Sequence, residues 1–256
     1  MEIYVGNSAF ALAPPGEDTP APTGGYGRWK RGLDCVVAVL LLGLAAPVVA
    51  LAAVLVKMTS RGPAFYSQVR LGLGGRPFRI YKLRSMYRDA EALTGPCWCM
   101  RGDRRVTPVG CFLRWSHLDE LPQMWNVLLG DMSVVGPRPE RPELVPGLEK
   151  AVPGYRERLM VRPGVTGLAQ VQLPPDADLN SVRIKLAHDL CYIQCLSFGL
   201  DCRIFLATIL RVLGAPVSLI RQVCALPDVA AAAASHRPGE TRPAVVADLQ
   251  PAYVRV

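Results

Sequence analysis

Residues 35–56 read CVVAVLLLGLAAPVVALAAVLV, a run of 22 residues without a charged side chain. A helix rises about 1.5 Å per residue, so a straight helix of this length would just cross the roughly 30 Å hydrocarbon core of a bilayer. Pro47 divides the run into arms of 12 and 9 residues, and neither arm spans a bilayer alone. Because proline removes a backbone hydrogen bond and bends a helix, we predict a re-entrant helix-break-helix with both ends on one side of the membrane.

Two alternatives to the re-entrant helix stay open. One is an ordinary spanning helix kinked at Pro47, since basic residues flank both ends of the run and identify neither end as translocated. The other is a cleaved signal peptide, which is disfavoured because its apolar region usually has about 7–15 residues and lies nearer the N-terminus.

The composition limits the class of protein. The chain has 256 residues, of which 50% are hydrophobic and 20% charged, which excludes a fully disordered chain and a collagen-like repeat. The presence of one long charge-free run excludes a many-span membrane protein. Eight cysteines are too few for a disulfide scaffold, so we expect reduced thiols, structural rather than metal-binding, and a chain whose bulk is cytosolic.

The net charge of +8 is unevenly distributed. Residues 28–88 hold eleven basic residues and one acid, Asp34, a local net charge of +10. A basic block beside an apolar run favours anionic headgroups or a phosphorylated ligand as partners. Nucleic acid is the competing interpretation, but no zinc-finger spacing or helix-turn-helix pattern supports it, so we expect no nucleic-acid partner.

Four segments follow from composition. Residues 1–27 and 226–256 are rich in Pro and Ala and are predicted to be a disordered tail at each end. Residues 28–61 are predicted to form a membrane helix with basic flanks, and residues 62–225 a folded cytosolic domain.

The elements predicted for that domain are mainly helical. Residues 64–70 and 77–83 alternate like strands around a glycine-rich turn and predict a β-hairpin. Periodicity predicts helices over 83–93, 119–129 and 182–195, and one amphipathic helix over 198–224 that packs on the core or lies on a membrane surface. The fold class is therefore α+β, mainly helical, in a monotopic membrane protein.

The densest group of chemically active residues is LRWSHLDELPQ at 113–123. Its adjacent carboxylates, Asp119 and Glu120, could act as a nucleophile and a metal ligand, or Ser116 and Asp119 could form a capping box at the start of a helix. Both interpretations remain open from the residues alone. The loop GDMSVVGPRPERPE at 130–143 adds arginines, which bind phosphate bidentately, among prolines that fix their direction.

These blocks together resemble the bacterial polyprenyl-phosphate phosphoglycosyl transferases, the small monotopic sugar transferases. The resemblance runs from about residue 30 to 215. Its motifs are KRGLD at 30–34, GP at 62–63, QVRLG at 68–72, YKLRSM at 81–86, LDELPQ at 118–123, NVL at 126–128, GDMS at 130–133, VGPRP at 135–139 and PGVTG at 163–167. The family commonly has Ser-Pro at the membrane break, where this chain has Ala46-Pro47.

The resemblance implies a reaction and its residues. Such enzymes transfer a sugar 1-phosphate from a UDP-sugar to a polyprenyl phosphate such as undecaprenyl phosphate, release UMP, and begin exopolysaccharide, capsule, O-antigen or glycoconjugate assembly at the inner membrane, on its cytosolic face. By position, Asp119 is the nucleophile of a covalent intermediate and Glu120 holds Mg²⁺. Lys82 and Arg114 support the site, and we expect Arg138, Arg84 and Arg141 to bind substrate. His117, beside the carboxylates, is predicted to be a bystander.

Two other classes of function remain as alternatives. One is a catalytically inactive membrane scaffold for glycan-assembly enzymes, and the other is a basic module that binds anionic lipids. No residue distinguishes the sugar, the glycan pathway or the oligomeric state.

Overall fold

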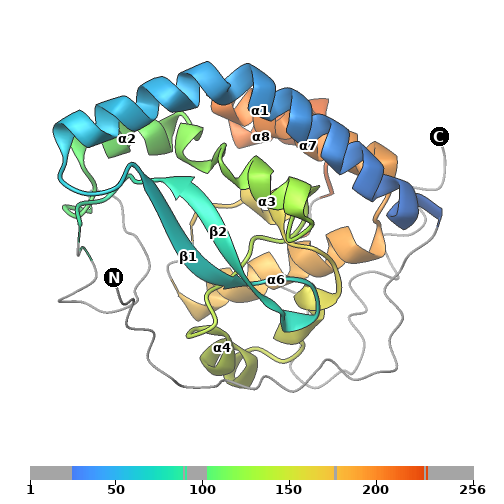
Figure 1. Cartoon of the computed structure of the whole chain (residues 1–256). Coiled ribbons are helices and arrows are strands. Elements are labelled where there is room, and N and C mark those ends of the chain that lie inside the picture. The colour runs from blue at the N-terminus through green and yellow to red at the C-terminus, as the bar shows by residue number, and fades with distance from the viewer. Residues whose placement is uncertain (1–24, 89, 91–102, 176–177, 228, 230–256) are drawn as a thin grey trace.

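The computed structural model describes residues 25–88, 90, 103–175, 178–227 and 229. Within these residues the chain is mainly helical with two small two-stranded sheets, which confirms the α+β prediction. Figure 1 shows the longest helix, α1, arching along one side of the molecule with α2, α3, α7 and α8 beneath it. The β-hairpin and α6 lie on the side of those helices away from α1.

Helix α1 spans Gly25–Thr59 and contains the whole apolar run. It starts three residues inside the predicted N-terminal tail and remains one continuous helix through Pro47 instead of breaking there. The stretch Trp29–Thr59 is long and apolar enough to cross a membrane by length and composition, and only 11% of its most apolar 18-residue window is buried. Most of the apolar surface of α1 is therefore left uncovered by the rest of the protein.

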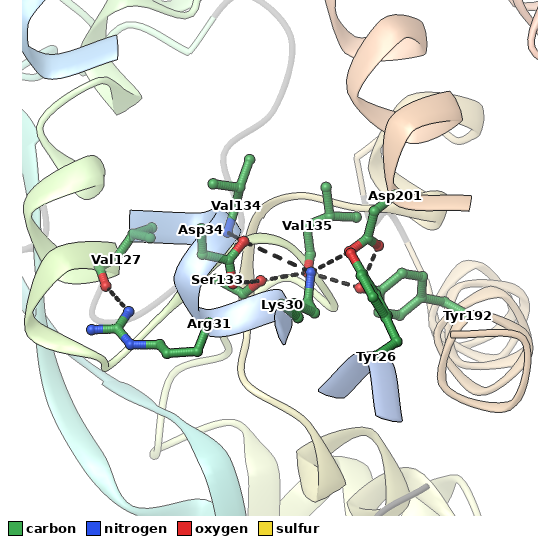
Figure 2. A network of polar contacts seen from close by, with 10 residues as sticks. All are labelled: Tyr26, Lys30, Arg31, Asp34, Val127, Ser133, Val134, Val135, Tyr192 and Asp201. Carbon is green, nitrogen blue, oxygen red and sulfur yellow. Dashed lines mark hydrogen bonds and ion pairs between the residues drawn. The ribbon is translucent and has the colours of Figure 1, made fainter. Parts of the chain in front are cut away.

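A polar network anchors the first turns of α1 (Figure 2). Asp34 accepts hydrogen bonds from the Ser133 hydroxyl at 2.7 Å and the Val134 amide at 3.1 Å, which joins α1 to strand β3 (Ser133–Val135). Lys30 pairs with Asp201 on helix α7 (Phe198–Val212). The KRGLD motif thus ties the membrane helix to the domain.

The same network has a second layer of contacts. Tyr26 and Tyr192 both donate to the Asp201 carboxylate, at 2.6 and 2.9 Å, and Tyr192 comes from helix α6 (Leu179–Gln194). Arg31 caps helix α3 (Gln123–Leu129) by donating to the Leu128 carbonyl at 2.8 Å and to the Val127 carbonyl. Because charges buried among matched partners are costly to separate, the start of α1 is firmly fixed.

The opposite end of α1 is also attached to the domain. Arg84 donates to the carbonyls of Arg61 and Ser60 at 2.6 and 2.8 Å. Nearby, Ala52 and Val56 of α1 pack with Leu83 and Leu113 in a small apolar cluster. Both ends of the apolar helix therefore contact one folded unit.

The predicted hairpin is confirmed. Strands β1 (Phe65–Leu71) and β2 (Pro77–Leu83) pair antiparallel, with Phe65 opposite Leu83, and the 3₁₀ turn η1 (Leu73–Gly75) joins them. The helix predicted over 83–93 is wrong for residues 84–88, which continue in extended or turn conformation, with Met86 forming a bridge to Val106. The remainder of that prediction falls outside the described residues, apart from residue 90 in a turn.

The second sheet was not predicted. Strand β3 pairs in parallel with β4 (Gly164–Thr166), inside segments that the sequence presented as glycine- and proline-rich loops. A Cβ atom on Gly164 would lie 2.1 Å from the Gly136 amide nitrogen, so only glycine permits this approach of the two strands. The strand pair fixes the point at which the loop after β3 begins.

The other helices complete the core. The predicted amphipathic helix over 198–224 is two helices, α7 and α8 (Val217–Val223), because Gly214 adopts a positive φ of 84° and Pro216 follows it. The short segments α4, η3 and α5 cover Val145–Ala151, Tyr155–Met160 and Leu168–Gln172. Leu226 and Val229 are buried in the main core, so packing continues past the predicted domain end at residue 225.

Candidate active site

The adjacent carboxylates lie in a short turn between two helices. Helix α2 (Pro108–Trp115) ends at Ser116, whose hydroxyl donates back to the Phe112 carbonyl at 2.8 Å, so the Ser116–Asp119 capping box does not form. His117 adopts a left-handed conformation, with φ 57°, and turns the chain into the 3₁₀ turn η2 (Leu118–Glu120). Histidine tolerates this region better than most residues do. The turn directs Asp119 inward, where only 7% of its surface is exposed.

Glu120 is the centre of a charge cluster. Its Oε1 atom lies 2.6 Å from Lys82 Nζ and 2.8 Å from Arg138 Nη2. Lys82 comes from β2, and Arg138 comes from the loop after β3, so three separate elements meet at one carboxylate. Sequence reasoning assigned Lys82, Glu120 and Arg138 to the same site, and the structure brings them together.

Asn126 holds these elements in register. It is fully buried on α3, accepts a hydrogen bond from the Tyr81 amide at 3.1 Å, and donates to the Arg79 carbonyl at 2.6 Å. Because both bonds go to β2, they fix the strand that carries Lys82 against the segment that follows Glu120. The sequence placed Asn126 in a motif but did not indicate this role.

The charges shift the pKa values of the two carboxylates in opposite directions. Burial, reinforced by the Glu120 carboxylate, raises the pKa of Asp119 to about 6, although Lys82, Arg114 and Arg138 act against this rise. Burial would also raise the pKa of Glu120, but Arg138 and Lys82 outweigh it and hold that pKa well below its usual value. At neutral pH both side chains are therefore largely ionised, and Asp119 is the more basic of the two. Asp119 also has no short ion pair of its own among the described contacts, so it is the better candidate for a nucleophile.

The remaining predicted site residues lie in different surroundings. Arg114 Nε donates to the Ser85 hydroxyl at 2.8 Å and contributes to the field at Asp119. Arg141 lies 3.6 Å from Glu143 in the loop that carries Arg138. Arg84, predicted to bind substrate, instead has its guanidinium against the carbonyls at the end of α1, so its observed contacts belong to the membrane helix.

The two adjacent carboxylates, Asp119 and Glu120, suit a magnesium ion that the substrate phosphates would also bind. No group of three or more His, Cys, Asp or Glu side chains able to hold a metal occurs among the described residues. Mg²⁺ is usually held by one or two carboxylates together with substrate phosphates and water, and Asp119 and Glu120 supply that number. The Glu120 Oε2 atom has only a 3.4 Å contact with Arg138, which leaves it able to accept a further ligand.

The cysteines show no sign of a metal or disulfide role in the part of the chain that the structure covers. Cys191 on α6 and Cys195, the residue that caps the end of α6, are free thiols, and Cys35, Cys111, Cys202 and Cys224 are also free. Cys97 and Cys99 lie outside the described residues.

Comparisons with known proteins agree with the geometry. Residues 26–215 match the family described as bacterial sugar transferase. The chain is 44% identical over 213 residues to a UDP-glucose:undecaprenyl-phosphate glucose-1-phosphate transferase of Caulobacter vibrioides, covering 82% of this chain and 78% of that protein. It is also 44% identical over 194 residues to a UDP-N-acetylgalactosamine-undecaprenyl-phosphate N-acetylgalactosaminephosphotransferase of Aeromonas hydrophila, covering 76% of this chain but only 45% of that relative.

A third relative is an exopolysaccharide production protein of Rhizobium leguminosarum. It is 38% identical over 186 residues, which cover 70% of this chain and 92% of the relative. The sequence-based assignment to the sugar transferases is therefore confirmed.

Proposed function

The chain belongs to the bacterial sugar transferase family, and from that premise we propose that it is an enzyme that transfers a sugar 1-phosphate from a UDP-sugar to undecaprenyl phosphate and releases UMP. The observation that carries the proposal is the buried Asp119 beside the Lys82–Glu120–Arg138 cluster. A nucleophilic carboxylate surrounded by cations suits attack on the diphosphate of a UDP-sugar, because the cations offset the repulsion between anions.

The reaction proceeds in two displacements. A carboxylate oxygen of Asp119 attacks the sugar-bearing phosphorus, the bond to the UMP oxygen breaks, and a phosphosugar remains attached to Asp119. An oxygen of undecaprenyl phosphate then attacks the same phosphorus and releases Asp119. This covalent route allows a soluble donor and a membrane-held acceptor to react one after the other at one site.

Lys82 and Arg138 stabilise the charge that develops on the transferring phosphoryl group. Glu120 holds these two cations in place through Oε1. Its other carboxylate oxygen, together with Asp119, would hold Mg²⁺. When bound, Mg²⁺ would neutralise the charge on the diphosphate of the donor. Arg141 lies in the same loop as Arg138, and we assign it to the donor nucleotide.

The membrane part of the proposal rests on both ends of α1. A spanning helix would place its ends on opposite sides of the bilayer, whereas Lys30 and Asp34 at one end and the carbonyls of Ser60 and Arg61 at the other contact the same domain. These contacts support a helix that enters and leaves the membrane on one side, and we assign that side to the cytosolic face of the inner membrane.

The helices next to α1 also expose apolar side chains, which supports the same orientation. Helices α2, α3, α7 and α8 lie on the α1 side of the molecule (Figure 1). They expose large apolar side chains to the outside: Phe112, Trp115, Trp125, Leu129, Leu206, Ile209, Leu213, Leu219 and Val223. Amphipathic helices with exposed tryptophans are typical of the membrane interface, where the acceptor phosphate lies.

The direct test is release of UMP by detergent-purified protein with Mg²⁺, undecaprenyl phosphate and one UDP-sugar at a time. Two relatives of equal identity carry different sugars in their names, so the panel includes UDP-glucose and UDP-N-acetylgalactosamine. We expect multiple turnovers with at least one donor and only with acceptor present. If the folded protein releases no UMP with any UDP-sugar of a wide panel, the result would favour a membrane scaffold instead. The name of the Rhizobium leguminosarum relative favours exopolysaccharide assembly as the pathway.

A further inference from the structure

The loop that carries Arg138 is held by its backbone. Four consecutive carbonyls of this loop, those of residues 137 to 140, each accept a hydrogen bond from a different place in the fold. The bonds are Gly164 N to Pro137 O at 2.8 Å, Arg158 Nη2 to Arg138 O at 2.9 Å, Arg70 Nη1 to Pro139 O at 3.3 Å and Leu71 N to Glu140 O at 3.0 Å. Two of the four donors are arginine side chains, and one of these, Arg158, donates to the carbonyl of Arg138 itself.

Arg158 is itself held rigidly. Its guanidinium donates to the Tyr155 hydroxyl at 2.6 Å and lies 2.8 Å from the Asp189 carboxylate on α6. Only 6% of Arg158 is exposed, and Asp189 is 2% exposed. One end of the planar guanidinium contacts Tyr155, and the other contacts Asp189 and the Arg138 carbonyl. The guanidinium therefore cannot rotate without losing a partner, and it fixes the loop relative to α6.

We propose that Arg158, locked by Asp189 and Tyr155, is a positioning residue that sets the place of the Arg138 guanidinium beside Glu120. This inference rests on the proposed function, because it assigns Arg138 to the transfer site. Arg158 contacts the loop at the Arg138 carbonyl and, at 3.8 Å, at the Glu140 carboxylate two residues further along, whereas its contacts with Asp189 and Tyr155 lead away from Asp119. Its effect on turnover must therefore pass through Arg138.

The test is a double-mutant cycle between Arg158 and Arg138. Because R158M alone would leave Asp189 as a buried unpaired charge, the working variant is R158M/D189N, which removes both charges together. R158K, which keeps the charge beside Asp189 without the planar fork, serves if that variant fails to fold. The matched control is R156M, in the same 3₁₀ segment, because Arg156 lies 3.8 Å from Glu149 on α4.

UMP release gives the first readout. We expect R158M/D189N to lower kcat/KM roughly tenfold to a hundredfold, since small displacements of a positioned group have effects of that order. In an R138A background the same change should lower kcat/KM by less than about twofold, because the group that it positions is gone. R156M should leave kcat/KM unchanged. An equal loss in both backgrounds would overturn the proposal.

Hydrogen exchange gives a second readout that does not depend on turnover. In R158M/D189N the amides of Arg138, Glu140 and Arg141 should exchange faster than in the unmodified protein, while R156M should leave them unchanged. Unchanged exchange in the loop would refute the positioning role even if the enzyme were active. Faster exchange in a protein that turns over no donor would support the positioning role and count against the proposed function alone.

Discussion

Replacing Asp119 with asparagine should abolish turnover and at the same time make the protein more stable. The substitution keeps the shape of the side chain and removes its charge. In the folded protein, burial and Glu120 raise the pKa of Asp119 from 3.8 to about 6. A carboxyl group whose pKa is raised on folding destabilises the folded state whenever it is ionised.

The magnitude follows from the size of that shift. A rise of about 2 units, at about 1.4 kcal/mol per unit, gives at most roughly 3 kcal/mol of stability gained by D119N above pH 6. The gain should shrink as the pH falls from 6 toward 4, because the carboxyl group of the folded protein becomes protonated while that of the unfolded chain is still ionised. It should vanish below about pH 4.

The assay is thermal unfolding in detergent from pH 4 to pH 8, together with UMP release at pH 7.5. E143Q is the control, because it makes the same carboxylate-to-amide change on a side chain that is 53% exposed. E143Q should change stability by less than about 0.5 kcal/mol at every pH. A D119N protein that is destabilised at pH 8, or that retains substantial turnover, would refute the reasoning about this site.

Three further changes test the surroundings of the site. K82M should lower turnover at pH 7 by at least about tenfold and lose less at pH 9, because Lys82 holds down the pKa of Asp119 and each unit of rise lowers the ionised fraction at pH 7 up to about tenfold; a deficit independent of pH would show that Lys82 does not act on Asp119. H117G should keep UMP release within about twofold and stability within about 1 kcal/mol, since glycine accepts the left-handed φ; a tenfold loss of turnover would make the imidazole catalytic. D34A should lower the free energy of unfolding by about 2–4 kcal/mol, because the Val134 amide loses its buried acceptor; an unchanged melting temperature in detergent would contradict the anchoring role.

Much of this site could be read from the sequence because its residues cluster in short motifs. Asp119 and Glu120 are adjacent, and Arg138 lies in a proline-rich loop whose rigidity is visible in its composition. The hairpin carrying Lys82 follows from alternation around glycines. That Lys82 and Arg138 meet at one carboxylate required the fold, because the strand and the loop are separated by more than 50 residues.

Other features could not be predicted, for identifiable reasons. Strands β3 and β4 have three residues each, too short for alternation to indicate a strand, and they are stabilised by their pairing across 30 residues of chain. Arg84 resembled a substrate ligand because it lies two residues after Lys82, a spacing that places both side chains on one face of a strand. Strand β2 ends at Leu83, however, and the Arg84 guanidinium reaches the carbonyls at the end of α1. Arg158 and Asp189 have no motif of their own, since only packing brings η3 and α6 together.

The most direct test of the account is the intact mass of the protein after incubation with Mg²⁺ and the active UDP-sugar in the absence of undecaprenyl phosphate. The account predicts a mass increase equal to one sugar phosphate, mapped to Asp119, absent from D119N and removed when undecaprenyl phosphate is added. Release of UMP with no adduct at any time, or an adduct that persists in D119N, would contradict the covalent role of Asp119.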